Sequence, residues 1–140
     1  GPDGAAAGDR DPGGADGADR ERDPAGTVNL LVATSRALDD AGLATLLATA
    51  VEAKAATLLA AAGVPGTTSD AAIVGCDPGG DPAAFAGSAT AVGGAARACV
   101  REAVRASLSA RYEGSAPPAS VADAEHGVET TRRASVFRIR

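Results

Sequence analysis

Two short apolar segments, each followed by a long segment with helical spacing, constrain the fold of this chain more than any other feature. The first is TVNLLVA at residues 27–33, and the second is AAIVGC at residues 71–76. Strands buried on both faces of a sheet contain nearly continuous apolar runs of this kind. The order strand, helix, strand, helix over residues 26–112 predicts an α/β or α+β fold.

The first helical segment has recognisable ends. Ser35 or the Asp pair at 39–40 can cap its N-terminus, and the helical spacing continues to about Ala62. Gly63 is suited to the position that ends the helix. Gly42 is expected to mark a break near its start. The apolar stripe expected on this helix comprises Leu43, Leu46, Leu47, Ala50, Lys54, Leu58 and Ala61.

The second helical segment is expected from about Ala91 to Tyr112. Its apolar stripe comprises Val92, Ala96, Cys99, Val100, Ala103, Ser107 and Leu108. Two strands make a poor sheet on their own. We therefore expect the β-α-β-α unit to be half of a larger sheet with helices packed on it.

The flanking segments differ from this unit in composition. Residues 1–25 contain no Val, Ile, Leu, Phe or Tyr and carry seven acids against three arginines, which predicts a disordered acidic linker rich in Gly, Asp and Ala. Residues 113–140 are expected to be a mostly disordered tail, in which only 135–139 could add a strand. Residues 26–112 carry seven acids and six bases, so the acidity of the chain says little about a substrate.

Composition also bears on the setting and the partners. The chain begins with Gly1 and contains no Met, which suggests a piece of a longer protein. No apolar run approaches the roughly 20 residues of a membrane span, so no membrane contact is expected. Cys76 and Cys99 lack metal-ligand spacing and are expected to be buried reduced thiols, which favours a cytoplasmic protein without a bound metal or resident cofactor.

The other charged residues give no sign of a nucleic-acid partner. Arg97, Arg101 and Arg105 recur every four residues and are expected to form a solvated face of the second helix. No aromatic residues are interleaved with them, as they would be in many nucleic-acid-binding surfaces. His126, the one histidine, lies in the tail and is given no role.

Lys54 is the one lysine of the chain, and it falls at the centre of the apolar stripe of the first helix. Lysine is rarely buried unless it is paired. A desolvated lysine can act as a base, a nucleophile or an oxyanion partner. The alternative is that its ammonium extends to water from the edge of the stripe. Glu52 lies on another side of the helix, where a site completed by a second part of the protein could use it.

A polar turn precedes the second strand. It contains three consecutive hydroxyl residues at 67–69 and a carboxylate at Asp70, and Gly66 would let a ligand approach the backbone. Hydroxyl, carboxylate and lysine together could hydrolyse an amide. The alternative is an ordinary turn held by its own side chains.

A glycine-rich segment, residues 87–94, precedes the second helix. Free N–H groups at such a helix start can hold an anion or an oxyanion. Close packing of the helix on a strand would equally explain the small residues.

Four segments in order resemble the adenosylcobinamide amidohydrolase family. They are GTVNL at 26–30, EAK at 52–54, GTTSDA at 66–71, and FAG at 85–87 followed by Thr90 and Gly93. The family has Thr where this chain has Ser69, which keeps the hydroxyl. The resemblance covers residues 26–112, roughly the C-terminal half of the family's domain, so we expect the N-terminal half of the same protein, or a homo-oligomer, to complete the site.

The resemblance implies hydrolysis of the amide that joins aminopropanol to the corrin ring of adenosylcobinamide, in cobinamide salvage for cobalamin synthesis. The corrinoid is then a small-molecule substrate and not a cofactor. As hypotheses, Lys54 is a base or an electrostatic stabiliser, Asp70 orients a water or hydroxyl, and Thr67 or Ser69 is a nucleophile or hydrogen-bonding group. The full candidate set is Lys54, Asp70, Thr67, Ser69 and Glu52 for catalysis, and Asn29, Gly66, Gly87, Thr90 and Gly93 for substrate binding.

Two other functions remain open on the sequence alone. One is a non-catalytic module that binds a corrinoid or nucleotide, with Lys54 paired to a phosphate. The other is a purely structural α/β unit, which a solvent-exposed Lys54 would favour.

Overall fold

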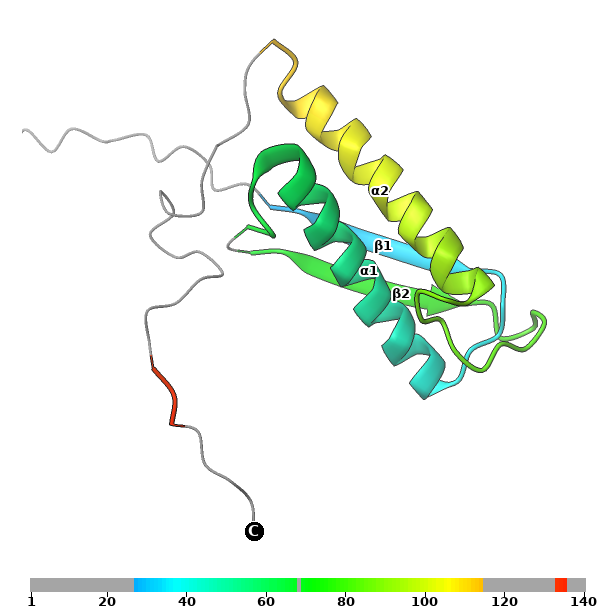
Figure 1. Ribbon diagram of the computed structural model, residues 1–140. Helices are drawn as coiled ribbons and strands as arrows, with labels where there is room; N and C mark the ends of the chain where they lie inside the picture. Colours follow the sequence, from blue (N-terminus) through cyan, green and yellow to red (C-terminus); the bar gives the residue numbers. More distant parts are fainter. Residues whose placement is uncertain (1–26, 68, 115–132, 136–140) are drawn as a thin grey trace, which may run out of the picture.

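The computed structural model describes residues 27–67, 69–114 and 133–135. Its elements are β1 (Asn29–Thr34), α1 (Asp40–Ala62), β2 (Ala71–Cys76) and α2 (Ala91–Arg111). The strands form a parallel pair, and the two helices lie side by side across one face of it (Figure 1). The predicted α/β class and element order are confirmed. The linker predicted at 1–25, His126 and most of the strand suggested at 135–139 lie outside the described residues.

The register of the sheet brings the ends of the two strands together. Asn29 lies opposite Ala71 and Thr34 lies opposite Cys76. Because the strands are parallel, both amino ends lie at one edge of the sheet and both carboxyl ends at the other. The turn before β2 and the loop after β1 are therefore separated by the length of a six-residue strand, about 20 Å.

The ends of α1 are set by local chemistry, as predicted. The Asp39 carboxylate accepts a hydrogen bond from the Gly42 amide at 2.7 Å, and Gly63 ends the helix with a φ of 72°. Only a residue without a side chain adopts that conformation readily. The predicted break at Gly42 is wrong: the helix is continuous there, and Gly42 packs so closely on Leu38 that a Cβ would lie 3.1 Å from its side chain.

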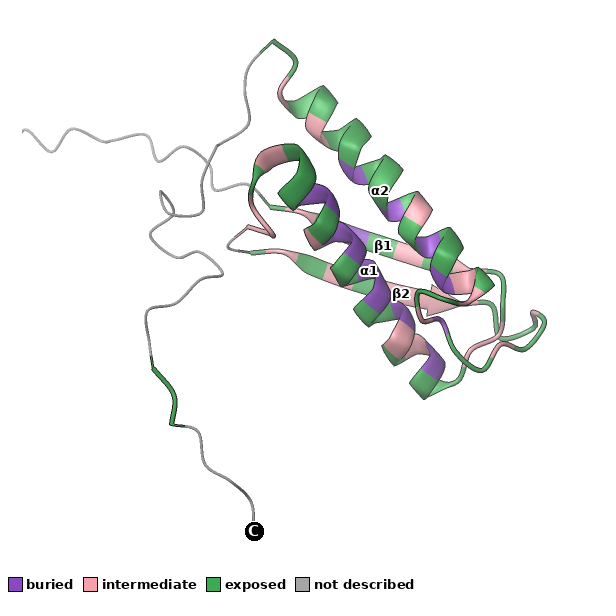
Figure 2. Ribbon diagram, in the orientation of Figure 1, coloured by how far each residue is buried: buried purple, intermediate pink, exposed green. Residues whose placement is uncertain are grey.

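The core lies between the helices and one face of the sheet. One cluster contains Leu30, Ala50, Ala53, Leu58, Val100 and Val104. A second, smaller cluster contains Leu46, Ala86 and Ala96. The buried residues of α1 and α2 lie on the sides that face each other and the sheet (Figure 2). Small alanines at these positions let the two helices approach closely.

The other face of the sheet is open among the described residues. Leu31 is 81% exposed and its partner Ile73 is 64% exposed. The prediction that both strands are buried on both faces is therefore wrong for this part of the chain. The physical reason is that both helices cover the same face, so alternate strand residues point away from the core.

α1 is apolar on almost every side. The side chains of Leu47, Val51 and Leu59 on this helix are 38–52% exposed. The predicted apolar stripe is therefore wrong at Leu47, and also at Ala61, which is exposed.

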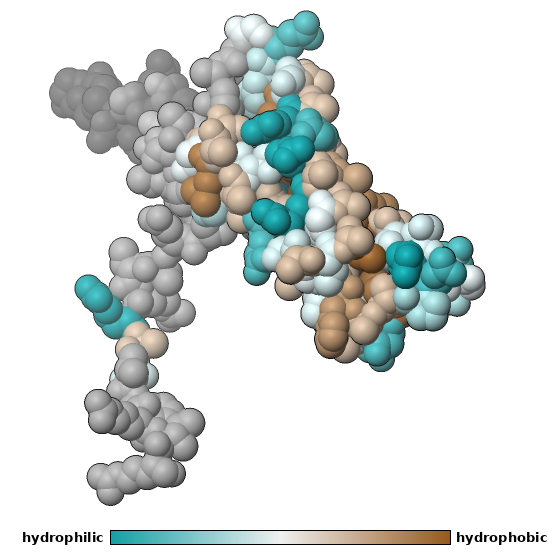
Figure 3. All heavy atoms as spheres, turned by 45° about the vertical axis from the view of Figure 1, so that its right-hand side comes forward, coloured by the Kyte–Doolittle hydropathy of each residue, from teal (hydrophilic) through white to brown (hydrophobic). Residues whose placement is uncertain are grey.

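Among the described residues α1 is long and apolar enough, by length and composition, to cross a membrane, so the prediction that no apolar run approaches that length is also wrong. In this fold eight of its residues are buried, and the surface in Figure 3 mixes polar and apolar groups.

The two cysteines are free, but the prediction that both are buried is wrong. Cys99 is exposed and Cys76 is partly buried. The buried side of α2 therefore differs from the predicted apolar stripe. Its buried residues are Gly93, Ala96, Val100 and Val104, while Ala103 and Ser107 are exposed.

Candidate functional site

Asp70 connects three parts of the fold at the amino edge of the sheet. Its Oδ1 accepts hydrogen bonds from the Val28 amide at 2.9 Å and from the Thr67 hydroxyl. Its Oδ2 accepts hydrogen bonds from the Lys54 ammonium and from the Thr67 amide, the latter at 3.0 Å. The carboxylate therefore joins α1, the turn before β2 and the residue that precedes β1.

Lys54 is buried, as its place on the helix predicted. The residue is only 8% exposed, and the side chains of Lys54 and Asp70 are each 10% exposed. The alternative in which its ammonium extends to water is excluded by this geometry. A buried ammonium needs a partner of opposite charge, and Asp70 supplies it.

The hydrogen bonds to Asp70 also determine its charge. Burial alone would raise the pKa of Asp70, but the hydrogen bonds from Lys54, Thr67 and Val28 outweigh burial and hold that pKa below its usual range. Asp70 is therefore a carboxylate at neutral pH. With four donors already bound, it has little capacity to take a proton from a further group.

Gly66 is required by this ion pair. A Cβ at Gly66 would lie 2.9 Å from Asp70 Oδ2 and 3.6 Å from Lys54 Nζ. The sequence suggested that Gly66 lets a ligand approach the backbone. In the structure, the group that approaches Gly66 is the Asp70 carboxylate.

The other residues predicted near this turn are more exposed. The Ser69 hydroxyl lies 2.6 Å from the Thr27 hydroxyl at the surface. Asn29 is exposed at the start of β1. Glu52 is exposed on α1 and, as predicted, does not face Lys54. The structure thus brings together Lys54, Thr67 and Asp70, with Gly66 in contact, and leaves Glu52 apart.

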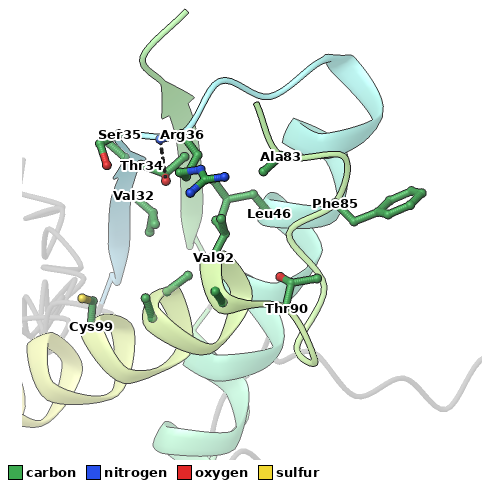
Figure 4. A pocket seen from close by; sticks show the side chains of 14 residues that line it. Val32, Thr34, Ser35, Arg36, Leu46, Ala83, Phe85, Thr90, Val92 and Cys99 are labelled. Atoms are coloured by element: carbon green, nitrogen blue, oxygen red, sulfur yellow. Dashed lines mark hydrogen bonds between the residues drawn. The ribbon is translucent and has the colours of Figure 1, made fainter. Parts of the chain in front are cut away.

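A cavity of about 370 Å³ lies at the opposite edge, where β1 ends. Clefts at the carboxyl ends of parallel strands are common ligand sites in α/β proteins. Its walls come from the end of β1, the residues that follow it, α1, the loop before α2, and α2 itself. The labelled lining residues in Figure 4 are Val32, Thr34, Ser35, Arg36, Leu46, Ala83, Phe85, Thr90, Val92 and Cys99.

The loop after β1 and the loop after β2 are joined next to this cavity. The Arg36 guanidinium donates to the carbonyls of Asp81 at 3.0 Å and Pro82 at 2.9 Å. The Ala37 amide also donates to the Asp81 carbonyl at 3.0 Å. A Cβ at Gly80 would collide with the Ser35 carbonyl, so the two loops are in direct backbone contact.

Two threonines of α1 fix the part of the loop between β2 and α2 that contains Ala86. The Ala86 amide donates to the Thr45 hydroxyl at 3.0 Å, and the Thr49 hydroxyl donates to the Ala86 carbonyl at 2.9 Å. Ala86 itself is completely buried. Sequence reasoning missed Arg36, Thr45 and Thr49. The only available signal for the threonines was their spacing of four residues on a helix otherwise rich in Ala and Leu.

The glycine-rich segment at residues 87–94 runs into the first turn of α2, and Gly93 is the one of its three glycines that is tightly packed. Thr90 caps the helix, since its hydroxyl accepts a hydrogen bond from the Gly93 amide at 3.0 Å, and it also lines the cavity. Gly93 is buried, and a Cβ there would collide with the Gly87 carbonyl. Gly93 is therefore explained by close packing, but the start of α2 packs on the loop at residues 86–87 and not, as predicted, on a strand. Gly87 has open space around its Cβ position.

The described residues contain no group of three or more His, Cys, Asp or Glu side chains arranged to hold a metal ion. The three arginines expected on a solvated face of α2 are exposed. Neither the turn nor the cavity presents a concentration of positive charge.

Comparison with known proteins identifies the family of this α/β unit. The model of the family described as adenosylcobinamide amidohydrolase matches residues 3–116. The chain therefore belongs to the adenosylcobinamide amidohydrolase family, and the resemblance carried by its four segments is confirmed.

A relative supports the same assignment. The chain is 62% identical over 128 residues to the adenosylcobinamide amidohydrolase of Halobacterium salinarum. The alignment covers 91% of this chain and 54% of that protein, so the chain spans about half the length of this relative. No solved structure matches the chain.

Proposed function

We propose that the complete protein hydrolyses the amide between aminopropanol and the corrin ring of adenosylcobinamide. Water cleaves the C–N bond of the amide, and its hydroxyl goes to the acyl carbon and its proton to the nitrogen. The products are adenosylcobyric acid and 1-aminopropan-2-ol, and the setting is cobinamide salvage. The observation that carries this proposal is the 62% identity to an adenosylcobinamide amidohydrolase over 91% of the chain.

The cavity at the carboxyl edge supports a site for part of such a substrate. Its volume of about 370 Å³ suits a side arm or a nucleoside-sized group, at the small end of ligand pockets. The corrin macrocycle is too large for it and would lie outside. Most of its lining is apolar, and Thr34 and Ser35 provide hydroxyls that can bind an amide.

The catalytic roles predicted for Lys54, Thr67, Ser69, Asp70 and Glu52 stay a prediction. In their favour, an ammonium, a carboxylate and a hydroxyl lie within hydrogen-bonding contact. Against a role as free base, each oxygen of the Asp70 carboxylate already accepts two hydrogen bonds within the fold. The cluster also lies towards the other end of the strands from the cavity, and Lys54 is about 12 Å along α1 from the lining residue Leu46, so one small group of the substrate cannot contact both.

Lys54→Arg in the complete protein tests the predicted role. If the ammonium acts in catalysis, turnover falls even at a temperature well below melting, while the Michaelis constant changes little. If the pair only stabilises the fold, the melting temperature falls and turnover at a temperature well below melting is unchanged.

The activity itself is tested by incubating the complete protein with adenosylcobinamide. Release of 1-aminopropan-2-ol, measured by mass spectrometry against a heat-treated sample, is the expected result. Binding of the corrinoid without release would contradict the proposal and favour a binding module.

We propose that the open face of the sheet is covered by the part of the family protein that lies outside this chain, rather than by a second copy of the chain. The exposed Leu31–Ile73 pair supports it. A cysteine introduced at Leu31, with Cys76 and Cys99 replaced by serine, should react with a maleimide in the 140-residue chain and be protected in the complete protein. Equal reactivity in both would contradict this partner.

The free thiols of Cys76 and Cys99 support the proposal of a cytoplasmic setting.

A further inference from the structure

Phe85 is an exposed aromatic residue that the core does not explain. It is 60% exposed and borders the cavity at the carboxyl edge of the sheet. The chain has only two Phe, one Tyr and no Trp. A chain that uses aromatic residues so sparingly places this one at the surface, and its ring extends outward from the cavity rim (Figure 4).

The backbone next to Phe85 is fixed. The following residue, Ala86, is fully buried, and both of its backbone polar groups are bonded to hydroxyls of α1. Further along the loop towards β2, the Arg36 guanidinium binds two consecutive carbonyls. The backbone that carries the Phe85 ring is therefore held in place, which reduces the conformational entropy lost when a ligand contacts the ring.

We propose that Phe85 is a specificity residue that stacks on the adenine of the adenosyl group. This inference rests on the proposed function. Adenine is a flat aromatic ring, whereas the corrin ring is not fully conjugated and carries substituents on both faces. The cavity beside Phe85 is mostly apolar and large enough to take the attached sugar. Stacking of a base on an aromatic side chain is insensitive to the hydrogen-bonding pattern of the base, which suits a rim with few polar groups.

The test compares two ligands that differ at the upper axial position. Dissociation constants for adenosylcobinamide and cyanocobinamide are measured by rapid mixing with the complete protein, before the amide is hydrolysed, for wild type, Phe85→Ala and Phe85→Tyr. We expect Phe85→Ala to weaken adenosylcobinamide binding about 10- to 100-fold and to leave cyanocobinamide binding unchanged within about 2-fold. Phe85→Tyr, which keeps the ring, should restore the affinity for adenosylcobinamide.

Leu59→Ala is the matched control, because Leu59 is also a half-exposed apolar residue but lies near the other end of α1. It should affect neither ligand. Equal weakening of both ligands by Phe85→Ala would overturn the proposal, since the ring would then contact the corrin or support the loop. No weakening of either would also overturn it, since Phe85 would then be covered by the rest of the protein. Failure of wild-type protein to release aminopropanol would refute the proposed activity, while the two binding constants would still decide the role of Phe85.

Discussion

Replacing Asp70 by Asn should lower the free energy of unfolding of the complete protein by about 3–5 kcal/mol. The Asp70 carboxylate accepts four hydrogen bonds, one of them from a lysine that is 8% exposed. The amide oxygen of Asn accepts about two of them, so two donors lose their acceptor. The Lys54 ammonium also loses its negative partner, and an uncompensated buried charge is the largest part of the loss.

Chemical unfolding in urea, followed by circular dichroism at neutral pH, measures this loss. Asp81→Asn is the matched control, since that side chain is exposed and makes no hydrogen bond with the described residues. It should change the free energy of unfolding by less than about 0.5 kcal/mol. Lys54→Met combined with Asp70→Asn should cost less than the sum of the two single changes, by about 1–3 kcal/mol. A loss below about 1 kcal/mol for Asp70→Asn, with no coupling to Lys54, would refute the view that this pair holds the fold together.

The same pair predicts a pH dependence with a definite sign. The pKa of Asp70 is lowered in the folded state, whereas the unfolded chain has a value of about 3.9. The stabilisation by the charged carboxylate is therefore complete above about pH 4 and is lost as the pH falls through the folded pKa. The stability difference between wild type and Asp70→Asn should shrink below pH 4. A difference that stays constant down to pH 2 would contradict this.

Three further predictions, with five substitutions, can be checked by the same unfolding measurement. Gly93→Ala should destabilise by about 1–3 kcal/mol because its Cβ meets a backbone carbonyl, whereas Gly94→Ala, which has open space around it, should stabilise by up to about 1 kcal/mol. Leu46→Ala should cost about 2–5 kcal/mol because Leu46 is fully buried, and Leu47→Ala, 38% exposed, should cost less than about 1 kcal/mol; equal losses would contradict the assigned core. Thr49→Val should cost about 1–3 kcal/mol by leaving a buried carbonyl unpaired, and no change would show that water replaces the hydroxyl.

Features of the fold that depend on local chemistry were predictable from the sequence. The capping residue Asp39 and the terminal Gly63 act through neighbours a few residues away, so their roles could be inferred from the sequence. The burial of Lys54 followed from helical periodicity. Its pairing with Asp70, 16 residues along the chain, could be suggested only as one of several combinations with the hydroxyls of the turn.

Features that depend on how the elements pack were not predictable. An apolar strand segment has the same composition whether helices cover one face of the sheet or both, so the exposure of Leu31 and Ile73 could not be foreseen. Ala86 is hydrogen-bonded to Thr49, which lies 37 positions earlier in the chain, and to Thr45, which lies 41 positions earlier. Nothing in the local sequence indicates these two hydrogen bonds. The cavity was missed for the same reason, because Arg36 and Phe85 come to line one cavity only after the two loops have joined.

The contacts of Asp70 also bear on the order in which the chain assembles. Its carboxylate closes one loop of 16 residues with Lys54 and another of 42 residues with Val28. Closing the longer loop costs about 0.9 kcal/mol more in chain entropy, and the shorter one involves a helix that forms within about a microsecond. The corner between α1 and β2 should therefore form first and then receive β1. Mutational analysis of the folding transition state would show this as high values around Lys54 and low values at Val28 and Leu30. One carboxylate would thus serve successively as the first tertiary contact of the domain and as the point where its sheet is completed.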